Sequence, residues 1–272
     1  MQVRGRSARA LDPVRKEYKD MKIAVITGAS SGMGREFVLQ LDREHSFDEI
    51  WVIARRRERL EELQALVKSK IRPICLDLTR EESVAEYQAL LEAEKPEVSV
   101  LVNASGFGRF GAFADIDLEA QYRMIDLNVK AYVGMTYVTL PYLREGSEVY
   151  QLDSLSSFQP VPYIGVYGAT KAFVLSFSRS LNVELKKRKI HVMAVCPGWV
   201  KTEFFDHAVT DNTITYYNKF FTAEQVITRA LKDMKRRRDI SICGFSVRTQ
   251  VFFTKLLPHK LVMKIWCKQQ KK

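Results

Sequence analysis

The 272-residue sequence has no uninterrupted apolar run of the roughly 18 to 20 residues that a membrane-spanning helix requires. Its first residues also lack the apolar stretch of a signal peptide. Cysteine is scarce, and the four cysteines stand singly, without the spacing of metal ligands or of a disulfide framework. We therefore expect a soluble, cytoplasmic protein with reduced thiols and no bound metal.

Acidic residues are in the minority: 43 Lys and Arg face 32 Asp and Glu, giving a formal net charge of +11. Such an excess raises the question of a nucleic-acid or anionic-membrane partner. The sequence contains no basic face interleaved with stacking aromatics and no nucleic-acid reading motif, so we expect no nucleic-acid partner. Part of the excess lies in residues 1–20, which we interpret as a flexible basic extension, with Met21 as the hypothetical biological start.

From Met21 onward, short apolar runs alternate with amphipathic stretches, the pattern of repeated βα units. This alternation predicts an α/β, doubly wound fold with a seven-stranded, mostly parallel sheet and helices on both faces. We expect strands at 22–27, 49–54, 71–76, 98–103, 148–153, 190–196 and 239–243. We expect helices near 33–44, 57–69, 81–94, 118–143, 164–188 and 222–237, within one domain spanning 21–244.

A glycine-rich segment, Thr27-Gly-Ala-Ser-Ser-Gly-Met-Gly34, joins the first predicted strand to the first predicted helix. Glycines allow a tight turn and a close approach to a pyrophosphate, while free N–H groups at a helix start attract negative charge. A turn chosen only for its geometry is the alternative, but the place between strand and helix favours a dinucleotide site. The predicted contacts are Gly28, Ser30, Ser31, Gly32, Met33 and Gly34.

Three arginines, Arg55, Arg56 and Arg57, follow the second predicted strand. In a dinucleotide fold this strand end faces the adenosine ribose, where an acidic residue selects the free 2′-hydroxyl and arginine favours a 2′-phosphate. Arginine binds phosphate oxygens in a bidentate manner. Solvated arginines are the alternative, although positive charge is mildly unfavourable at a helix start. We therefore predict that Arg55 and Arg56 select NADP(H) over NAD(H).

Tyr167 and Lys171 are separated by one helical turn near the start of a long amphipathic segment. This spacing places the phenol and the ammonium group on the same helix face. A nearby cation lowers the pKa of a phenol from about 10, so Tyr167 is a candidate general acid and base. Such a pair alone is common and usually structural.

Together these residues resemble the short-chain dehydrogenase/reductase family, from Met21 to about Gly244. The family motif TGxxxGxG is matched by the turn ending at Gly34, and YxxxK is matched by Tyr167 and Lys171. The resemblance implies a single-domain Rossmann fold, hydride transfer between NADP(H) and a carbonyl or alcohol substrate, and a homodimer or homotetramer.

The resemblance also implies how the catalytic groups divide the work. Ser154, thirteen positions before Tyr167, would bind the substrate oxygen, with Ser156 and Ser157 as close rivals. Tyr167 would donate a proton in reduction and accept one in oxidation. Lys171 would lower the pKa of the phenol and hold the nicotinamide ribose. A non-catalytic NADP(H)-binding regulator is the rival function, and the presence of these groups together disfavours it.

Further roles follow from the same resemblance. Asn128, in the helix before the serine strand, would hold a water molecule that relays protons. The remaining implied cofactor contacts are Asp77, Leu78, Asn103, Ser105, Gly106, Pro197, Gly198, Val200 and Thr202. Two features depart from the family pattern: Ala104 replaces a frequent asparagine, and Asp153 precedes Ser154 where a second serine is frequent.

Two segments bear on the substrate. Residues 203–221, in the family's substrate-loop position, contain Phe204, Phe205, Tyr216, Tyr217, Phe220 and Phe221. A mobile aromatic lid suits an apolar substrate such as a steroid, an acyl derivative or a xenobiotic carbonyl. The alternative is that these aromatic side chains serve only to pack the segment against the rest of the domain. Residues 245–272 are a basic amphipathic tail interrupted at Pro258. It could contact an anionic membrane surface, a partner subunit or the chain's own substrate cleft.

Overall fold

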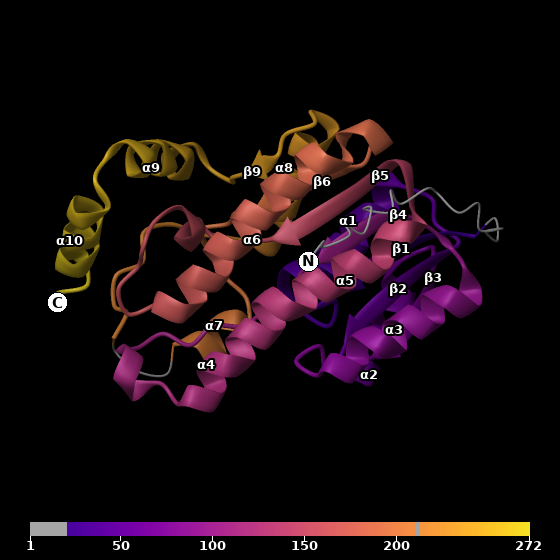
Figure 1. The fold of residues 1–272 in the computed structure, drawn as a ribbon, viewed down its shortest axis with the longest axis horizontal. Helices are drawn as coiled ribbons and strands as arrows, with labels where there is room; N and C mark the ends of the chain where they lie inside the picture. The colour runs from indigo at the N-terminus through magenta and orange to yellow at the C-terminus, as the bar shows by residue number, and fades with distance from the viewer. Residues whose placement is uncertain (1–20, 210–212) are drawn as a thin grey trace, which may run out of the picture.

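A seven-stranded sheet in the order β3-β2-β1-β4-β5-β6-β9 forms the centre of the computed structural model, which describes residues 21–209 and 213–272 (Figure 1). Every neighbouring pair is parallel, so the sheet is fully rather than mostly parallel. The strands are β1 (Lys22–Thr27), β2 (Glu49–Ala54), β3 (Lys70–Cys75), β4 (Glu97–Asn103), β5 (Leu143–Leu152), β6 (His191–Val195) and β9 (Ile240–Ser241). All seven predicted strands are confirmed, and the strand order reverses between β1 and β4, where ligands bind in such sheets.

Helices cover both faces of the sheet because successive strand residues point to opposite sides. In β1, Ala24 and Ile26 face α1 (Gly32–Glu44), α2 (Arg57–Glu61) and α8 (Ala223–Lys235). Ile23 and Val25 face α3 (Glu81–Glu94), α5 (Ala131–Thr139) and α6 (Gly165–Glu184). The predicted doubly wound α/β fold is therefore confirmed, with one apolar core on each side of the sheet.

Two helices of the structure differ from the predicted helices in their bounds or form. The helix expected over 57–69 is wrong in its second half, since α2 ends at Glu61 and a 3₁₀ turn over Glu62–Leu66 brings the chain back to the edge strand β3. The segment expected over 118–143 comprises α4 (Leu118–Ile125), a π-helical turn at Asp126–Lys130, α5 and a short 3₁₀ turn. Thr222 and Gln225 form a capping box at the start of α8.

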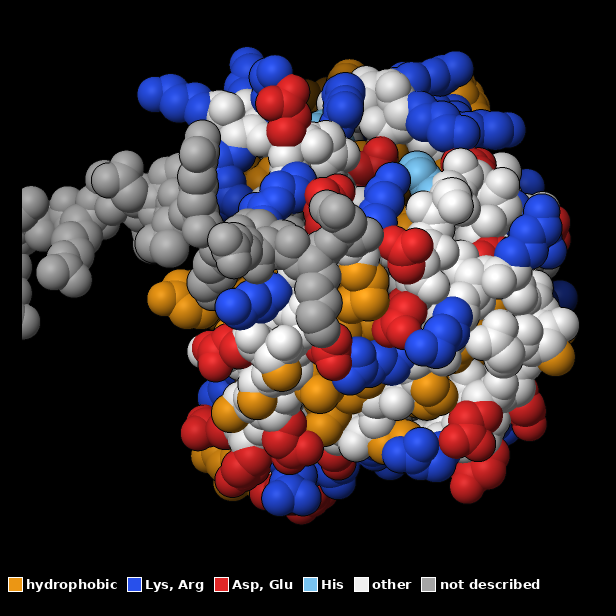
Figure 2. Space-filling model, turned by 90° about the vertical axis from the view of Figure 1, so that its right-hand side faces the viewer, with side chains coloured by type: hydrophobic (Ala, Val, Ile, Leu, Met, Phe, Trp, Pro, Cys, Tyr) orange, Lys and Arg blue, Asp and Glu red, His pale blue; other side chains and the backbone are white. Residues whose placement is uncertain are grey.

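The end of the molecule where the strands begin carries charges of both signs. Figure 2 shows this face, with Lys and Arg interspersed among Asp and Glu rather than gathered in a field of one sign. The carboxyl ends of the strands lie at the opposite end of the sheet (Figure 1).

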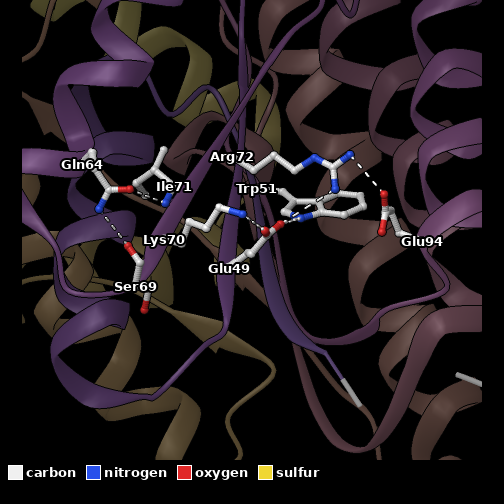
Figure 3. A network of polar contacts seen from close by, with 8 residues as sticks. All are labelled: Glu49, Trp51, Gln64, Ser69, Lys70, Ile71, Arg72 and Glu94. Carbon is white, nitrogen blue, oxygen red and sulfur yellow. Dashed lines mark hydrogen bonds and ion pairs between the residues drawn. The ribbon is translucent and has the colours of Figure 1, made fainter. Parts of the chain in front are cut away.

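A polar network anchors the start of β2 to the edge strand β3 (Figure 3). The buried Glu49 carboxylate accepts hydrogen bonds from Trp51 Nε1 at 2.9 Å and Lys70 Nζ at 2.7 Å. The Arg72 guanidinium lies 4.5 Å from the centre of the Trp51 ring and pairs with Glu94 at 3.6 Å. The network satisfies a buried charge and fixes the strand that presents Arg55 and Arg56 at its other end.

The C-terminal residues form two helices, α9 (Phe245–Leu256) and α10 (His259–Gln269), separated by Pro258 as expected. In Figure 1 they lie at the left end of the molecule, beyond the carboxyl ends of the strands. A short helix, α7 (Phe204–Ala208), and a small sheet of β7 (Trp199–Val200) and β8 (Phe220–Phe221) were not predicted. Residues 1–20, predicted to be a flexible extension, lie outside the described residues. Within the described part of the chain, no helix combines the length and apolarity needed to cross a membrane.

Candidate active site

A cleft of about 990 Å³ opens at the carboxyl ends of the strands. It brings together residues that are far apart in the sequence, including the catalytic candidates Ser154, Tyr167 and Lys171. The predicted cofactor residues that line it are Gly28, Ser30, Ser31, Gly32, Met33, Gly34, Arg55, Arg56, Asp77, Leu78, Ser105, Gly106, Pro197, Gly198, Val200 and Thr202. This volume lies at the upper end of the range of about 300 to 1,000 Å³ for ligand pockets, so a cofactor and a substrate could share the cleft.

The glycine turn forms one wall of the cleft, and two of its positions require glycine. Gly28 has a φ of +67°, and a Cβ there would lie 2.7 Å from the carbonyl oxygen of Ala104. A Cβ on Gly34 would lie 2.2 Å from the carbonyl oxygen of Gly28. The turn therefore packs backbone against backbone and leaves the start of α1 facing the cleft.

Arg55 and Arg56 stand at the tip of β2, beside the glycine turn. Arg56 donates from Nη2 to Ser30 Oγ at 3.1 Å and pairs through Nη1 with Glu203 at 3.0 Å. Arg59 also pairs with Glu203. Glu203, which the sequence analysis did not single out, thus links this end of the cleft to the segment that begins α7.

Asp77 faces the same end of the cleft. Burial acts to raise the pKa of its carboxyl, but hydrogen bonds from Thr79 and the nearby charge of Arg55 more than offset this, so the pKa is lowered. The carboxylate accepts from Thr79 N at 3.1 Å and from Thr79 Oγ1 at 2.8 Å. Asp77 is therefore ionised and fixed in place by its own turn.

Tyr167 and Lys171 lie on one face of α6, as predicted, and both are buried. Lys171 Nζ lies 5.8 Å from the centre of the Tyr167 ring and donates to the Leu152 carbonyl oxygen at 2.8 Å. The predicted lowering of the phenol pKa is wrong for the chain by itself: burial raises the pKa of Tyr167, and only a hydrogen bond with Ser154 opposes this. The phenol is therefore protonated at neutral pH.

An unpredicted carboxyl group adjoins this pair. Asp153 is 2% exposed, and its Oδ2 accepts a hydrogen bond from Cys196 Sγ at 3.3 Å, while Oδ1 has no partner among the described atoms. Burial raises the pKa of Asp153 and lowers that of Lys171, and the attraction between the two opposes both shifts. In the sequence Asp153 stands out only as a departure from a frequent serine, because nothing local to it shows that Lys171 is near.

Two predicted asparagines lie behind the cleft rather than in its wall. Asn128, in the π-helical turn, donates to the Phe107 carbonyl oxygen at 2.9 Å and to Thr170 Oγ1 at 3.1 Å, and its Oδ1 accepts from Phe107 N at 3.2 Å. It holds the loop beside Lys171, and its water-holding role stays a prediction. Asn103 donates to Gln151 Oε1 at 3.1 Å inside the sheet, so the structure does not bring this predicted cofactor residue to the cleft.

Aromatic rings form the other half of the cleft. The rings of Phe110 and Phe204 each lie 5.6 Å from the ring of Tyr167, and Trp199 packs against Phe110 at 6.4 Å. Of the six aromatics predicted for the lid, Phe204, Phe205 and Tyr216 line the cleft, whereas Tyr217, Phe220 and Phe221 do not. Some rings therefore face the cleft and others pack the segment on the body, and the mobility of this segment stays a prediction.

The C-terminal helices complete this apolar half. Nine residues of α9, α10 and their connection line the cleft: Gln250, Val251, Phe253, Thr254, Leu257, Val262, Ile265, Trp266 and Gln269. Trp266 Nε1 donates to the Pro162 carbonyl oxygen at 3.0 Å, and the buried Gln270 accepts from the N–H groups of Thr215 and Tyr216 at 2.8 and 3.0 Å. Of the three roles left open for the tail, packing across the chain's own cleft is confirmed.

Comparisons with known proteins agree with this architecture. The family model described as short chain dehydrogenase matches residues 22–213. Sulfoacetaldehyde reductase 2 of Chromohalobacter salexigens is 35% identical over 191 residues, which cover 67% of this chain and 74% of the relative.

Among solved structures, a short-chain dehydrogenase from Sphingobium yanoikuyae in complex with NADPH superimposes with a TM-score of 0.74 at 26% identity, covering 90% of this chain and 96% of that one. The bulky-bulky ketone specific alcohol dehydrogenase from Comamonas testosteroni gives a TM-score of 0.68 at 26% identity, covering 82% and 86%. The chain belongs to the short-chain dehydrogenase/reductase family of oxidoreductases, which act on alcohols and carbonyl compounds.

Proposed function

We propose that this protein is an NADP(H)-dependent oxidoreductase that interconverts a bulky, apolar ketone or aldehyde and the corresponding alcohol. The observation that carries the proposal is the meeting of Ser154, Tyr167 and Lys171 in one cleft with the glycine turn and an aromatic wall. Proton-handling groups, a dinucleotide cradle and an apolar compartment are what carbonyl reduction requires.

The protonated phenol fits the role of proton donor. Because burial keeps the Tyr167 proton in place at neutral pH, the side chain can deliver it to the oxygen of a carbonyl as negative charge develops there. Ser154, which hydrogen-bonds the phenol, would hold the same oxygen within reach of Tyr167. Lys171 is fixed by the Leu152 carbonyl oxygen, so its charge stays near the reacting atoms.

The residues at the cleft fit a nicotinamide dinucleotide. Gly28 and Gly34 let the turn pack closely on the chain's own backbone, and the start of α1, which faces the cleft, would then hold the pyrophosphate. Ser30, Arg55 and Arg56 would hold the 2′-phosphate of NADP(H), since they gather one hydroxyl and two guanidinium groups at the tip of β2. When bound, the cofactor supplies the hydride.

The aromatic half of the cleft supports an apolar substrate. Phe110, Trp199 and Phe204 surround the Tyr167 side of the cleft, and Val262 and Ile265 of α10 add aliphatic surface. The relatives named a sulfoacetaldehyde reductase and a bulky-ketone alcohol dehydrogenase act on carbonyl compounds or alcohols of very different size. The cleft of this chain favours the larger and more apolar end of that range.

A substrate panel tests the reaction. Purified protein is mixed with NADPH and a series of steroid, long-chain acyl and aromatic ketones and aldehydes, and NADPH absorbance is followed. We expect oxidation of NADPH with apolar ketones and little with small polar ones. Tight NADPH binding without turnover on any member would favour the rival function, a non-catalytic NADP(H)-binding regulator.

A pair of arginine variants tests the cofactor. Combined Arg55→Ala and Arg56→Ala substitutions should weaken NADPH binding far more than NADH binding, by roughly a hundredfold if two charge-assisted contacts are lost. The matched control is Arg57→Ala, because Arg57 pairs with Glu61 on α2 and does not line the cleft. Equal losses for both cofactors in the double variant would refute the assignment of the 2′-phosphate site.

Self-association is a further part of the proposal. Tyr122 on α4 and Val133 and Tyr137 on α5 are exposed apolar side chains, and Tyr137 is 75% exposed. Faces of this kind often pack against a second copy. Light scattering should show a dimer or tetramer that Tyr137→Glu weakens; a monomer at every concentration would refute it.

A further inference from the structure

The C-terminal helices expose large apolar side chains at the molecular surface, and some of these also reach the cleft. Phe245 is 78% exposed and Leu256 is 65% exposed. The other exposed members of this set, which we call the tail surface, are Phe252, Phe253, Leu257, Leu261 and Ile265. Large apolar side chains gathered in this way mark an interaction site.

The charge of the same segment has one sign. Residues 245–272 contain seven Lys and Arg and no Asp or Glu: Arg248, Lys255, Lys260, Lys264, Lys268, Lys271 and Lys272. Among the described residues, none of these seven forms an ion pair with a carboxylate. Lys255 and Lys272 lie over the rings of Phe158 and Tyr163, at 5.0 and 5.6 Å from the ring centres. The segment still combines exposed apolar side chains with positive charge that no carboxylate balances, unlike the mixed face at the other end of the molecule (Figure 2).

The tail surface continues into the cleft. Phe253, Leu257 and Ile265 are exposed on the surface and also line the cleft wall. Val251 and Val262, on the inner faces of α9 and α10, are buried against the body and line the cleft as well. A molecule bound at the tail surface would lie beside the apolar entrance.

We propose that α9 and α10 dock the protein on an anionic phospholipid bilayer. Basic amphipathic helices bind such surfaces through apolar side chains inserted at the headgroup level and lysines facing acidic lipids. A second copy fits less well, because a two-fold contact through this surface would bring two sets of seven cations together. If the proposed function holds, the docked cleft would receive apolar substrates from the lipid phase.

Vesicle co-sedimentation of the full chain tests the docking without any need for turnover. The probes are vesicles of phosphatidylcholine alone and of phosphatidylcholine with phosphatidylglycerol. We expect binding to the mixed vesicles, weaker binding at high salt, and little binding to phosphatidylcholine alone. The combined Lys260→Gln, Lys264→Gln and Lys268→Gln variant, which changes three exposed lysines of α10, should bind roughly a hundredfold more weakly, since each lysine near an anionic surface contributes several-fold in affinity.

Two further variants separate the apolar contribution from general surface effects. Phe252→Ser with Leu256→Ser removes exposed side chains that do not line the cleft and should also reduce binding. The matched control is Val183→Ser with Lys186→Gln and Lys187→Gln, at the end of α6 and in the 3₁₀ turn that follows it, which should bind as the parent does. Unfolding temperatures near that of the parent confirm that each variant is folded.

The outcomes are distinct. Failure of the parent to bind mixed vesicles, or equal loss in the control, overturns the proposal. The proposal is also overturned if a tail variant converts a dimer to monomers while the parent does not bind vesicles, because the tail surface then binds a second copy of the chain. Vesicle binding without turnover on any ketone supports the docking and counts only against the proposed function.

Discussion

A single added methyl group at Gly34 should damage the cofactor site more than its size suggests. The new Cβ would lie 2.2 Å from the Gly28 carbonyl oxygen and 2.6 Å from the Gly28 carbonyl carbon, both of them backbone atoms. To reach even a tight contact, the start of α1 must move from β1 by about 1 Å, an overpacking that costs about 1–3 kcal/mol. The displaced N–H groups are those expected to face the pyrophosphate, so NADPH affinity should fall by roughly ten- to a hundredfold.

Two measurements check Gly34→Ala: the midpoint of thermal unfolding and the NADPH dissociation constant from cofactor fluorescence. A loss of about 2 kcal/mol lowers the midpoint by about 4 to 8 °C in a chain of this size. Gly165→Ala is the control, because no heavy atom lies within 4 Å of the Cβ that it adds at the start of α6. Parent-like stability and NADPH affinity in Gly34→Ala would refute the proposed close packing of turn and helix.

Three other changes have definite expected outcomes. Gln270→Ala leaves two backbone N–H groups unpaired in the segment before β8, so KM for the ketone should rise while NADPH affinity is unchanged; a parent-like KM contradicts this. Burial lowers the pKa of Lys171, and the negative charge of Asp153 partly opposes this shift. Asp153→Asn removes that charge, so the alkaline limb of the plot of kcat/KM against pH should move to lower pH. An unmoved limb would refute the coupling of the two groups. Burial acts to raise the pKa of Asp42, but hydrogen bonds from residues 68–69 outweigh it, so the pKa is lowered. The Asp42 carboxylate therefore stabilises the fold above pH 3.8, and this stabilisation is lost as the pH falls. In Asp42→Asn the free energy of unfolding should depend less on pH in the acid range, and a parent-like dependence contradicts this.

The strands and most helices could be predicted because their signals are local. Buried parallel strands are continuous apolar runs, and the turn from Thr27 to Gly34 marks the first βα unit. The end of α2 could not be predicted in the same way. Residues 57–67 keep an amphipathic pattern, but the chain must turn back to pair β3 with β2, and the last part tightens into a 3₁₀ turn.

The shared face of Tyr167 and Lys171 could also be predicted from sequence, because a helix fixes the relation of residues four apart. The direction of the phenol pKa could not, since burial depends on Phe110 and Phe204, which come from other segments. Likewise, the sequence of residues 245–272 indicated an apolar helix face but not that this face would pack over the cleft. Only the folded chain shows that Val262 is buried at the cleft while Phe252 and Leu256 are exposed and do not line it.

Turnover by Tyr167→Phe, measured with NADPH and the best ketone of the panel, is the most direct measurement of the proposed chemistry. Loss of the proton donor should lower kcat by roughly a hundred- to ten-thousandfold with NADPH affinity nearly unchanged. Tyr137→Phe, which removes the hydroxyl of an exposed tyrosine on α5, should leave kcat as in the parent. If Tyr167→Phe reduces the ketone as fast as the parent does, Tyr167 is not the proton donor and the proposed mechanism is wrong.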